Sequence, residues 1–209
     1  MAEYVPAAGR FMPVDLYDRS IELTMREPRW RPLVTRLAAG SDVVVEVGAG
    51  TGRQSLELER VCDQVIAVDG DPDALAIARR KPGADGIDWR SGMADALPAD
   101  GGVASVVVMT LLLHHLDADA KRRALSEALR VLRPGGRIVI ADWGRPGGPL
   151  AALGFRGLML FDGAAGTADH AAGRLPLFVT DAGFNSARVW LRLPTAWGTL
   201  EVMSADRPT

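Results

Sequence analysis

The chain has 209 residues, of which 48% are hydrophobic and 24% charged, and its formal net charge at pH 7 is −2. This composition is ordinary for one globular domain, and the small charge gives no general attraction to nucleic acid or to an anionic membrane. The single cysteine, Cys62, excludes an intramolecular disulfide and a cysteine-rich metal site. No apolar run is long enough to cross a bilayer and the start lacks a signal-peptide pattern, so we expect a cytoplasmic protein.

Hydrophobic periodicity and turn residues predict helices and strands that alternate along the chain. Two helices, over residues 14–26 and about 31–39, are expected to form an N-terminal helical cap spanning residues 1–39. Strands are predicted at residues 43–47, 64–69, 87–90, 103–109 and 137–142, with a closing antiparallel pair at 186–193 and 198–205. Helices are predicted at residues 53–59, 74–80, 117–133 and 175–182, whereas residues 143–172 are expected to be irregular.

This order of elements predicts an α/β fold, a doubly wound and mostly parallel seven-stranded Rossmann-like sheet with an antiparallel C-terminal strand pair. Ligands of such sheets bind beyond the C-terminal ends of the strands. The residues that follow those ends are therefore the first candidates for a functional site.

The stretch from Glu46 to Gly52 ends the first strand and has the pattern acid-x-Gly-x-Gly-x-Gly. Glycine permits positive φ and lets a ligand approach the backbone, and the helix that follows is expected to offer free amides to polar groups of a ligand. A dinucleotide-binding fingerprint starting at Gly48 would need glycine where Arg53 stands, and the Gly-Lys-Ser/Thr of a P-loop is absent. The alternative is a Gly-rich turn that serves only packing.

The second strand ends in Asp69, which Gly70 follows. A carboxylate at this edge can accept both hydroxyls of a ribose in bidentate fashion. The alternative role, a cap for the next helix, fits Asp71 better because Pro72 follows it directly. Asp69 is therefore a candidate for ligand binding.

Five stretches carry a resemblance to a known family and stand in the order that the family has: residues 46–52, 65–69, 91–98, 106–116 and 129–137. Together they resemble the class I S-adenosylmethionine (SAM)-dependent methyltransferases over roughly residues 14–205, most of all the ubiquinone/menaquinone-biosynthesis type. The resemblance implies an enzyme that transfers a methyl group from SAM to a small, apolar or aromatic molecule, with an O, N or C acceptor left open. It also implies one SAM-binding domain over residues 1–209, with residues 143–172 as a substrate lid.

The family's cofactor-binding positions carry over to ten residues of this sequence: Tyr17, Glu46, Gly48, Gly50, Gly52, Asp69, Gly70, Met93, Ala94 and Thr110. By this resemblance Asp69 holds the ribose, the backbone carbonyl of Thr110 meets the methionine amino group, and Tyr17 touches the carboxylate end.

The sequence departs from the family's pattern at two positions. Met93 stands where the family has the Asp that accepts the adenine amino group, and Ala104 stands where an acid usually begins the fourth strand. Adenine could still meet the backbone amides of Met93 and Ala94 and pack on the Met93 side chain. Asp95 could accept the adenine amino group by turning inward. The alternative is that Asp95 is a solvated acid of the loop.

Catalytic candidates come from position, because the family has no universal catalytic residue. His114 and His115 follow the fourth strand and could act as a base or orient the acceptor, and Asp142 ends the fifth strand and could face the acceptor. The alternatives are that one of the two histidines hydrogen-bonds the backbone of the turn while the other is exposed, and that Asp142 serves as a cap at the strand end. His170 is a weaker candidate, for which a surface position is favoured, and no metal is expected because the histidines lack a paired acid at ligand spacing.

Other residues could shape the acceptor pocket. Trp143 could form one wall, and the apolar residues Met12, Leu158, Met159, Leu160 and Phe161 suggest an apolar pocket, with helix packing as the alternative.

Two rival functions stay open: a SAM-binding protein that does not methylate, such as a pericyclase, an isomerase or a regulatory protein, and a nicotinamide-dependent oxidoreductase, against which Arg53 argues. No nucleic-acid partner is expected, because the sequence has no basic patch with interleaved aromatics, and the oligomeric state is open.

Overall fold

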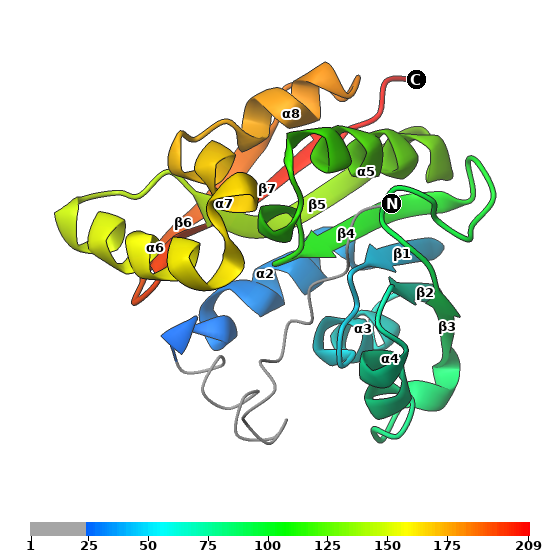
Figure 1. Ribbon diagram of the computed structural model, residues 1–209. Helices are drawn as coiled ribbons and strands as arrows, with labels where there is room; N and C mark the ends of the chain where they lie inside the picture. Colours follow the sequence, from blue (N-terminus) through cyan, green and yellow to red (C-terminus); the bar gives the residue numbers. More distant parts are fainter. Residues whose placement is uncertain (1–23) are drawn as a thin grey trace.

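The computed structural model describes residues 24–209 (Figure 1). Most of the helix expected over residues 14–26 lies outside the described residues, as do Met12 and Tyr17. Within residues 24–209 no helix is both long and apolar enough to span a membrane.

The sheet has seven strands: β1 (Val43–Val47), β2 (Gln64–Asp69), β3 (Ile87–Ser91), β4 (Ala104–Thr110), β5 (Leu132–Gly144), β6 (Arg188–Thr195) and β7 (Gly198–Asp206). Their order is β3-β2-β1-β4-β5-β7-β6, and only β7 runs antiparallel to its neighbours β5 and β6. The predicted fold class is therefore confirmed. In the register of the sheet Val47 pairs with both Val68 and Met109, so the carboxyl ends of β1, β2 and β4 lie side by side.

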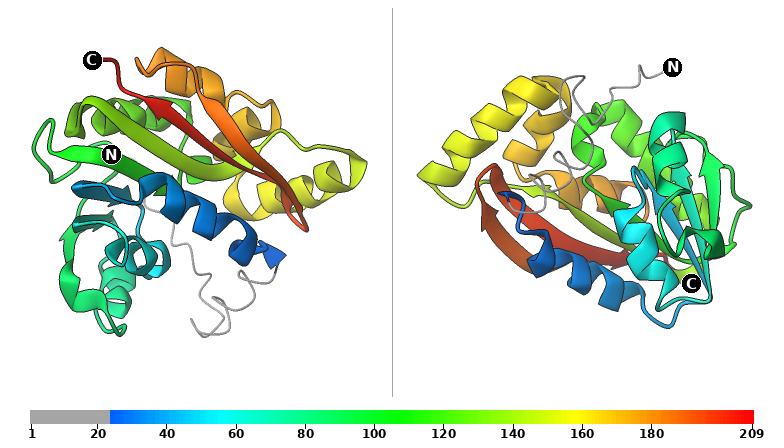
Figure 2. Two further views of the ribbon diagram at one scale, coloured as in Figure 1. Left: turned by 180° about the vertical axis from the view of Figure 1, so that it is seen from behind. Right: turned by 90° about the horizontal axis from the view of Figure 1, so that it is seen from below.

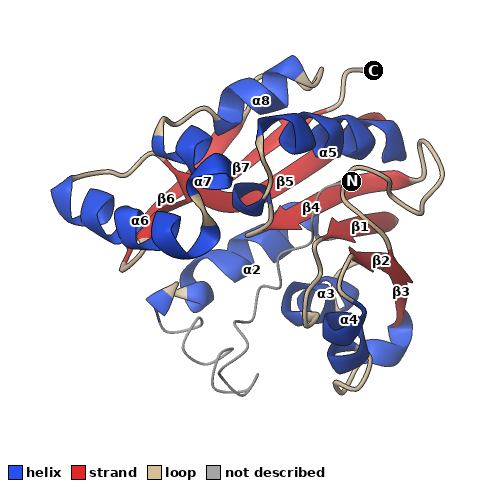
Figure 3. Cartoon of the chain, viewed as in Figure 1, coloured by secondary structure: helices blue, strands red, loops and turns tan. Residues whose placement is uncertain are grey.

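Helices cover both faces of the sheet (Figures 2 and 3). One face carries α2 (Glu27–Ala38), α3 (Arg53–Glu59) and α4 (Pro72–Ala78), and the other carries α5 (Ala118–Val131) and α8 (Leu175–Asp181). Two short 3₁₀ helices, η1 (Ala84–Gly86) and η2 (Leu113–His115), follow α4 and β4 in the chain. The crossovers that lead away from β1 in the two directions thus lie on opposite faces, and the chain reverses its strand order between β1 and β4, the usual place for a ligand.

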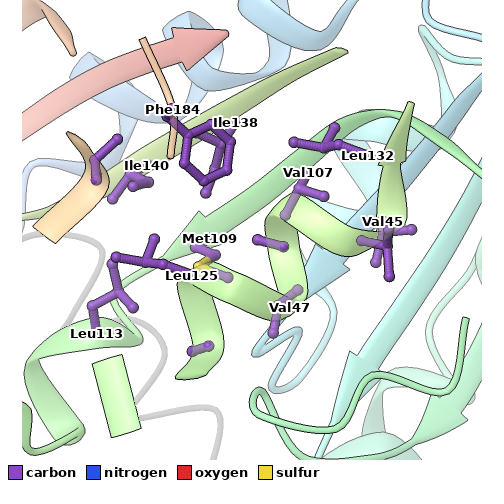
Figure 4. Close-up of a cluster of buried hydrophobic side chains, with 14 of the residues drawn as sticks. Val45, Val47, Val107, Met109, Leu113, Leu125, Leu132, Ile138, Ile140 and Phe184 are labelled. Atoms are coloured by element: carbon purple, nitrogen blue, oxygen red, sulfur yellow. The ribbon is translucent and has the colours of Figure 1, made fainter. Parts of the chain in front are cut away.

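The strands β1, β4 and β5 read as almost continuous apolar runs because both of their faces are buried. Figure 4 shows the buried cluster on the α5 side, in which Leu125 of α5 lies beside Met109 of β4, each at most 1% exposed. The Asp117 carboxylate caps α5 by accepting the Ala120 amide proton at 2.8 Å, and this bond lowers the pKa of Asp117.

The expectation of an irregular segment at residues 143–172 is wrong. It contains α6 (Pro149–Asp162) and α7 (Ala164–Ala171), separated by Gly163 at φ 87°. Glycines that suggested loops instead allow helices to approach their neighbours closely. A Cβ at Gly154 would clash with the carbonyl oxygen of Ala196, and a Cβ at Gly166 would clash with the carbonyl oxygen of His114.

The second predicted helix also begins earlier than expected. α2 starts at Glu27, and Pro28, which suggested an interruption, stands in its first turn, where its missing amide proton costs nothing.

Candidate cofactor and acceptor site

The glycine loop between β1 and α3 contains three residues with positive φ: Gly48 at 77°, Gly50 at 53° and Gly52 at 81°. This conformation favours glycine at each position. A Cβ at Gly48 would lie 2.9 Å from the Leu112 side chain, and one at Gly52 would lie 2.6 Å from the Trp89 ring. A Cβ at Gly50 would meet nothing within 4 Å. Packing thus accounts for Gly48 and Gly52, whereas Gly50 presents its backbone to open space.

Four amides of this loop are already hydrogen-bonded within the protein. Gly48 and Ala49 donate to the Val68 carbonyl at 2.8 and 3.1 Å, and Gly52 donates to the Ala49 carbonyl at 2.9 Å. Gly50 donates to Oδ2 of Asp69 at 2.6 Å. The loop therefore uses these amides to fasten β1 to β2 and to fix one carboxylate.

Asp69 is held at the end of β2 by two backbone amides. Oδ2 accepts from Gly50, and Oδ1 accepts from Asp71 at 2.7 Å. Burial raises the pKa of Asp69, against the opposing effect of these hydrogen bonds. A carboxylate has about four acceptor sites, so the fixed group can still accept a hydrogen bond from a ligand. Asp71 caps α4 by accepting from the Asp73 amide at 2.9 Å, which leaves Asp69 for another role.

Glu46 lies beneath the loop rather than in the open space above it. Its side chain is 1% exposed and accepts a hydrogen bond from the Ser55 hydroxyl at the start of α3. Burial raises the pKa of Glu46 to about 8, so this carboxyl is largely protonated at neutral pH. The structure thus places Glu46 where it connects β1 to α3.

Met93 lies next to the end of β2. A Cβ at Gly70 would lie 2.8 Å from the Met93 sulfur, so this side chain covers Gly70 while remaining 38% exposed. Ala94, its neighbour, is partly buried against the core. Asp95 pairs with Arg123 of α5 at 3.1 Å and is turned toward that helix. Of the side chains considered for adenine, that of Met93 is therefore the one beside Gly70, the residue that follows Asp69.

The carboxyl end of β4 contains a strained residue that sequence reasoning missed. Thr110 ends the strand at 8% exposure, and Leu111 follows with φ 52°, which is unfavourable for a residue with a side chain. The Leu111 amide donates to the Ala141 carbonyl of β5 at 2.8 Å, which holds the turn in place. Backbone strain of this kind gathers at functional sites. A leucine carries no sequence signal for it.

The structure brings His114 and Asp142 together. Nδ1 of His114 donates to Oδ1 of Asp142 at 2.8 Å, and the amides of Leu113 and Trp143 donate to the same carboxylate at 2.8 and 2.7 Å. Burial alone would raise the pKa of Asp142, but its interactions with His114 and His170 and these hydrogen bonds hold it well below its usual range. The bond to Asp142 fixes the His114 proton on Nδ1, which makes Nε2 the basic nitrogen.

His115 lies against His114, with ring centroids 4.0 Å apart. Burial and the neighbouring His114 lower the pKa of His115 to about 3. This imidazole is therefore neutral across the physiological range.

The preference for His170 as a surface residue is wrong. His170 is 0% exposed and its Nδ1 lies 2.6 Å from the Trp143 carbonyl oxygen and 3.9 Å from Oδ1 of Asp142. Helix α7 places it there, and Lys121 holds that helix by donating to the Gly166 carbonyl at 2.6 Å. The error follows from the loop assigned to residues 143–172, because an irregular segment gives a histidine no reason to be buried.

The fold and the strand-end site define a class of protein: a doubly wound α/β domain with a glycine loop after its first strand and a backbone-bonded acid at the end of its second. Residues 45–140 match the model of a family described as a methyltransferase domain. The chain is 33% identical over 144 residues to the demethylmenaquinone methyltransferase of Clavibacter sepedonicus. That match covers 66% of this chain and 58% of the relative, so the chain spans less than two thirds of the relative's length.

Two solved structures share the fold. The N-methyltransferase NodS of Bradyrhizobium japonicum, in complex with S-adenosyl-L-homocysteine (SAH), aligns with a TM-score of 0.70 at 15% identity over 91% of each chain. A SAM-dependent methyltransferase of Thermotoga maritima aligns with a TM-score of 0.69 at 20% identity over 95% of this chain and 96% of its own. The chain is thus similar to class I SAM-dependent methyltransferases, and several of the relatives that it matches are named as methyltransferases of menaquinone or ubiquinone biosynthesis. The cofactor of this class is SAM, which the open backbone at Gly50 and the fixed Asp69 carboxylate fit.

Proposed function

We propose that the protein transfers the methyl group of SAM to a small apolar or aromatic molecule. The observation that carries this proposal is the Asp69 carboxylate, which two amides hold beside the open backbone of Gly50. Because the chain covers only part of the length of its relatives, both the activity and the acceptor are proposals for this protein.

In this proposal Asp69 accepts the two ribose hydroxyls of SAM, and Met93 packs on the adenine while the amides of Met93 and Ala94 face its edge. The carbonyl of Thr110 meets the methionine amino group. The remaining cofactor positions line or support the same crevice, Tyr17 at the carboxylate end and Glu46 beneath the loop, with Gly48, Gly50, Gly52 and Gly70 giving the backbone its course. The closeness of the Met93 sulfur to Gly70, where it would lie 2.8 Å from an added Cβ, and the open space at Gly50 support this arrangement.

SAM, when bound, supplies an activated methyl group, so the protein has to position the acceptor in line with that group and exclude water. We assign the removal of an acceptor proton to Nε2 of His114, with Asp142 as the residue that positions it. Asp142 suits that role because it holds the Nδ1 proton at 2.8 Å and stays ionised. His115, whose pKa of about 3 makes it a weak base, is assigned to orienting the acceptor.

Residues 143–172 form the substrate lid in this proposal. Phe155 of α6 packs edge-on against Trp143 at 6.1 Å between ring centroids, and Leu158 and Met159 join the same apolar cluster. Leu160, by contrast, is 87% exposed, so it does not belong to that wall. The aromatic and aliphatic surface around Trp143 supports an acceptor with an apolar body.

The proposal is tested by replacing Asp69 with asparagine and titrating SAH by calorimetry. Asparagine keeps the shape but loses the charge and one acceptor oxygen, so we expect SAH to bind about 10- to 100-fold more weakly. Asp71→Asn is the matched control, since asparagine also caps helices, and it should bind SAH like the unaltered protein. Equal affinity in Asp69→Asn and the unaltered protein would contradict the proposal.

A SAM-binding protein that does not methylate is the competing function, and the methyltransferase family match and relatives do not favour it. Incubation with methyl-labelled SAM and candidate acceptors distinguishes the two, because label in the acceptor can come only from methyl transfer.

A further inference from the structure

Two buried polar atoms near His114 have no hydrogen-bond partner in the part of the chain that the structure describes. They are Nε1 of Trp143 and Nε2 of His170, in side chains that are 1% and 0% exposed. Buried polar groups are nearly always hydrogen-bonded, and leaving one unpaired destabilises the fold. Two such atoms beside the site assigned to the methyl acceptor therefore indicate that a ligand group or a water molecule binds there.

The chemistry of the two atoms is complementary. Nδ1 of His170 lies 2.6 Å from the Trp143 carbonyl oxygen, which can only accept, so Nδ1 carries the proton and Nε2 presents a lone pair. Burial lowers the pKa of His170, which keeps the imidazole in this neutral form. The indole Nε1 of Trp143 can only donate. One atom thus needs a donor and the other an acceptor, and a hydroxyl group is both.

The rings of Trp143 and His170 both lie next to His114, the proposed base. The His114 ring centroid lies 6.2 Å from that of Trp143 and 6.2 Å from that of His170, and both rings stand edge-on to it. The two rings that carry the orphan atoms are therefore both direct neighbours of His114. Phe155 packs edge-on against Trp143 and gives that ring an apolar neighbour.

We propose that His170 and Trp143 form a hydroxyl-binding site for the methyl acceptor. The hydroxyl group donates its hydrogen to Nε2 of His170, and its oxygen accepts the hydrogen of Nε1 of Trp143. This inference rests on the proposed methyl transfer and adds the feature that selects the acceptor. A site built to hydrogen-bond a hydroxyl discriminates against an analogue that lacks it, because its own buried polar atoms are then left unpaired.

The test uses His170→Asn, which keeps a donor at the position of Nδ1 for the Trp143 carbonyl and removes the acceptor at Nε2. Binding of 1-naphthol and of 1-methylnaphthalene, in which a methyl replaces the hydroxyl, is measured by NMR titration of the protein saturated with SAH. The ratio of the two affinities cancels general changes in the pocket. We expect this ratio to favour 1-naphthol in the unaltered protein and to fall about tenfold in His170→Asn.

Trp143→Phe, which keeps an aromatic ring and removes the donor, should lower the same ratio. In the unaltered protein 1-naphthol should also shift the Trp143 indole resonance. An unchanged ratio in both variants, or failure of the SAH complex to bind either naphthalene, overturns the hydroxyl site, and the two orphan atoms would then hold only water. Failure of SAH to bind the unaltered protein would instead remove the proposed function itself, so the two failures are distinguishable.

Discussion

At the scale of single residues, the site depends on carboxyl groups whose environments differ. Asp142 accepts three hydrogen bonds from His114, Leu113 and Trp143, and it stays ionised although it is 1% exposed. Glu46 is equally buried, but its pKa is raised to about 8 because the Ser55 hydroxyl and the more distant Arg31 do not offset the burial. The hydrogen bonds and charged partners that surround each buried acid therefore decide which acid is ionised.

The raised pKa of Glu46 predicts a pH dependence of stability. An unfolded glutamate has a pKa near its model value of 4.5, so between about pH 4.5 and 8 the folded state binds more protons than the unfolded state. The Glu46 contribution to the free energy of unfolding is then present below pH 4.5 and is lost as the pH rises to 8. Glu46→Gln removes this titration and keeps an acceptor for Ser55. In urea unfolding series from pH 5 to 8, the stability of Glu46→Gln relative to the unaltered protein should rise by up to about 1.4 kcal/mol per pH unit. Parallel pH profiles would show that Glu46 is ionised in the fold.

How far the site could be predicted from sequence differs among its residues. Glu46, Asp69 and Asp142 could be placed at strand ends because buried strands are readable as apolar runs, and parallel strands end at a common edge. The bond between His114 and Asp142 could not, because it joins residues 28 positions apart through side-chain orientation. The burial of His170 was missed for a different reason, which lies at the next scale.

At the scale of elements, the difficult segment was the one between β5 and α8. Gly and Pro residues from 143 to 172 favoured a loop, yet α6 and α7 are helices in which Gly154 and Gly166 face a neighbouring backbone. A single sequence cannot tell a glycine that breaks a helix from one that allows a helix to pack closely. Most other described elements were predicted to within a few residues because their apolar patterns agree with their turn residues. β5 is an exception, since it begins at Leu132, whereas its start was expected at residue 137.

Two glycines of this segment make a matched pair for testing that explanation. A Cβ at Gly166 of α7 would clash with the His114 carbonyl oxygen, whereas a Cβ at Gly157 of α6 would meet nothing within 4 Å. Gly166→Ala should therefore lower the free energy of unfolding by about 1–3 kcal/mol through overpacking. Gly157→Ala should raise it by roughly 0.5–1 kcal/mol, because alanine is the better helix former. Urea unfolding measures both changes, and equal effects at the two positions would mean that α7 does not press on η2.

At the scale of the whole molecule, the strand order β3-β2-β1-β4-β5-β7-β6 brings the ends of β1, β2 and β4 together at the point where the order reverses. Apart from Tyr17, the residues assigned to SAM come from these three ends and from the loop after β3, and His114 and Asp142 come from the ends of β4 and β5. A cofactor and an acceptor held by adjacent strand ends would face each other across the β1–β4 boundary. The fold thus accounts for the division of the site into a cofactor part and an acceptor part.

The central claim is that the Asp69 carboxylate, fixed by the amides of Gly50 and Asp71, holds the ribose of the cofactor. A crystal structure of the protein grown with SAH measures this directly. The account predicts both ribose hydroxyls within about 2.5–3.0 Å of the Asp69 carboxylate oxygens, with the adenine against Met93. SAH bound elsewhere, or an Asp69 side chain turned away from the sugar, would contradict it.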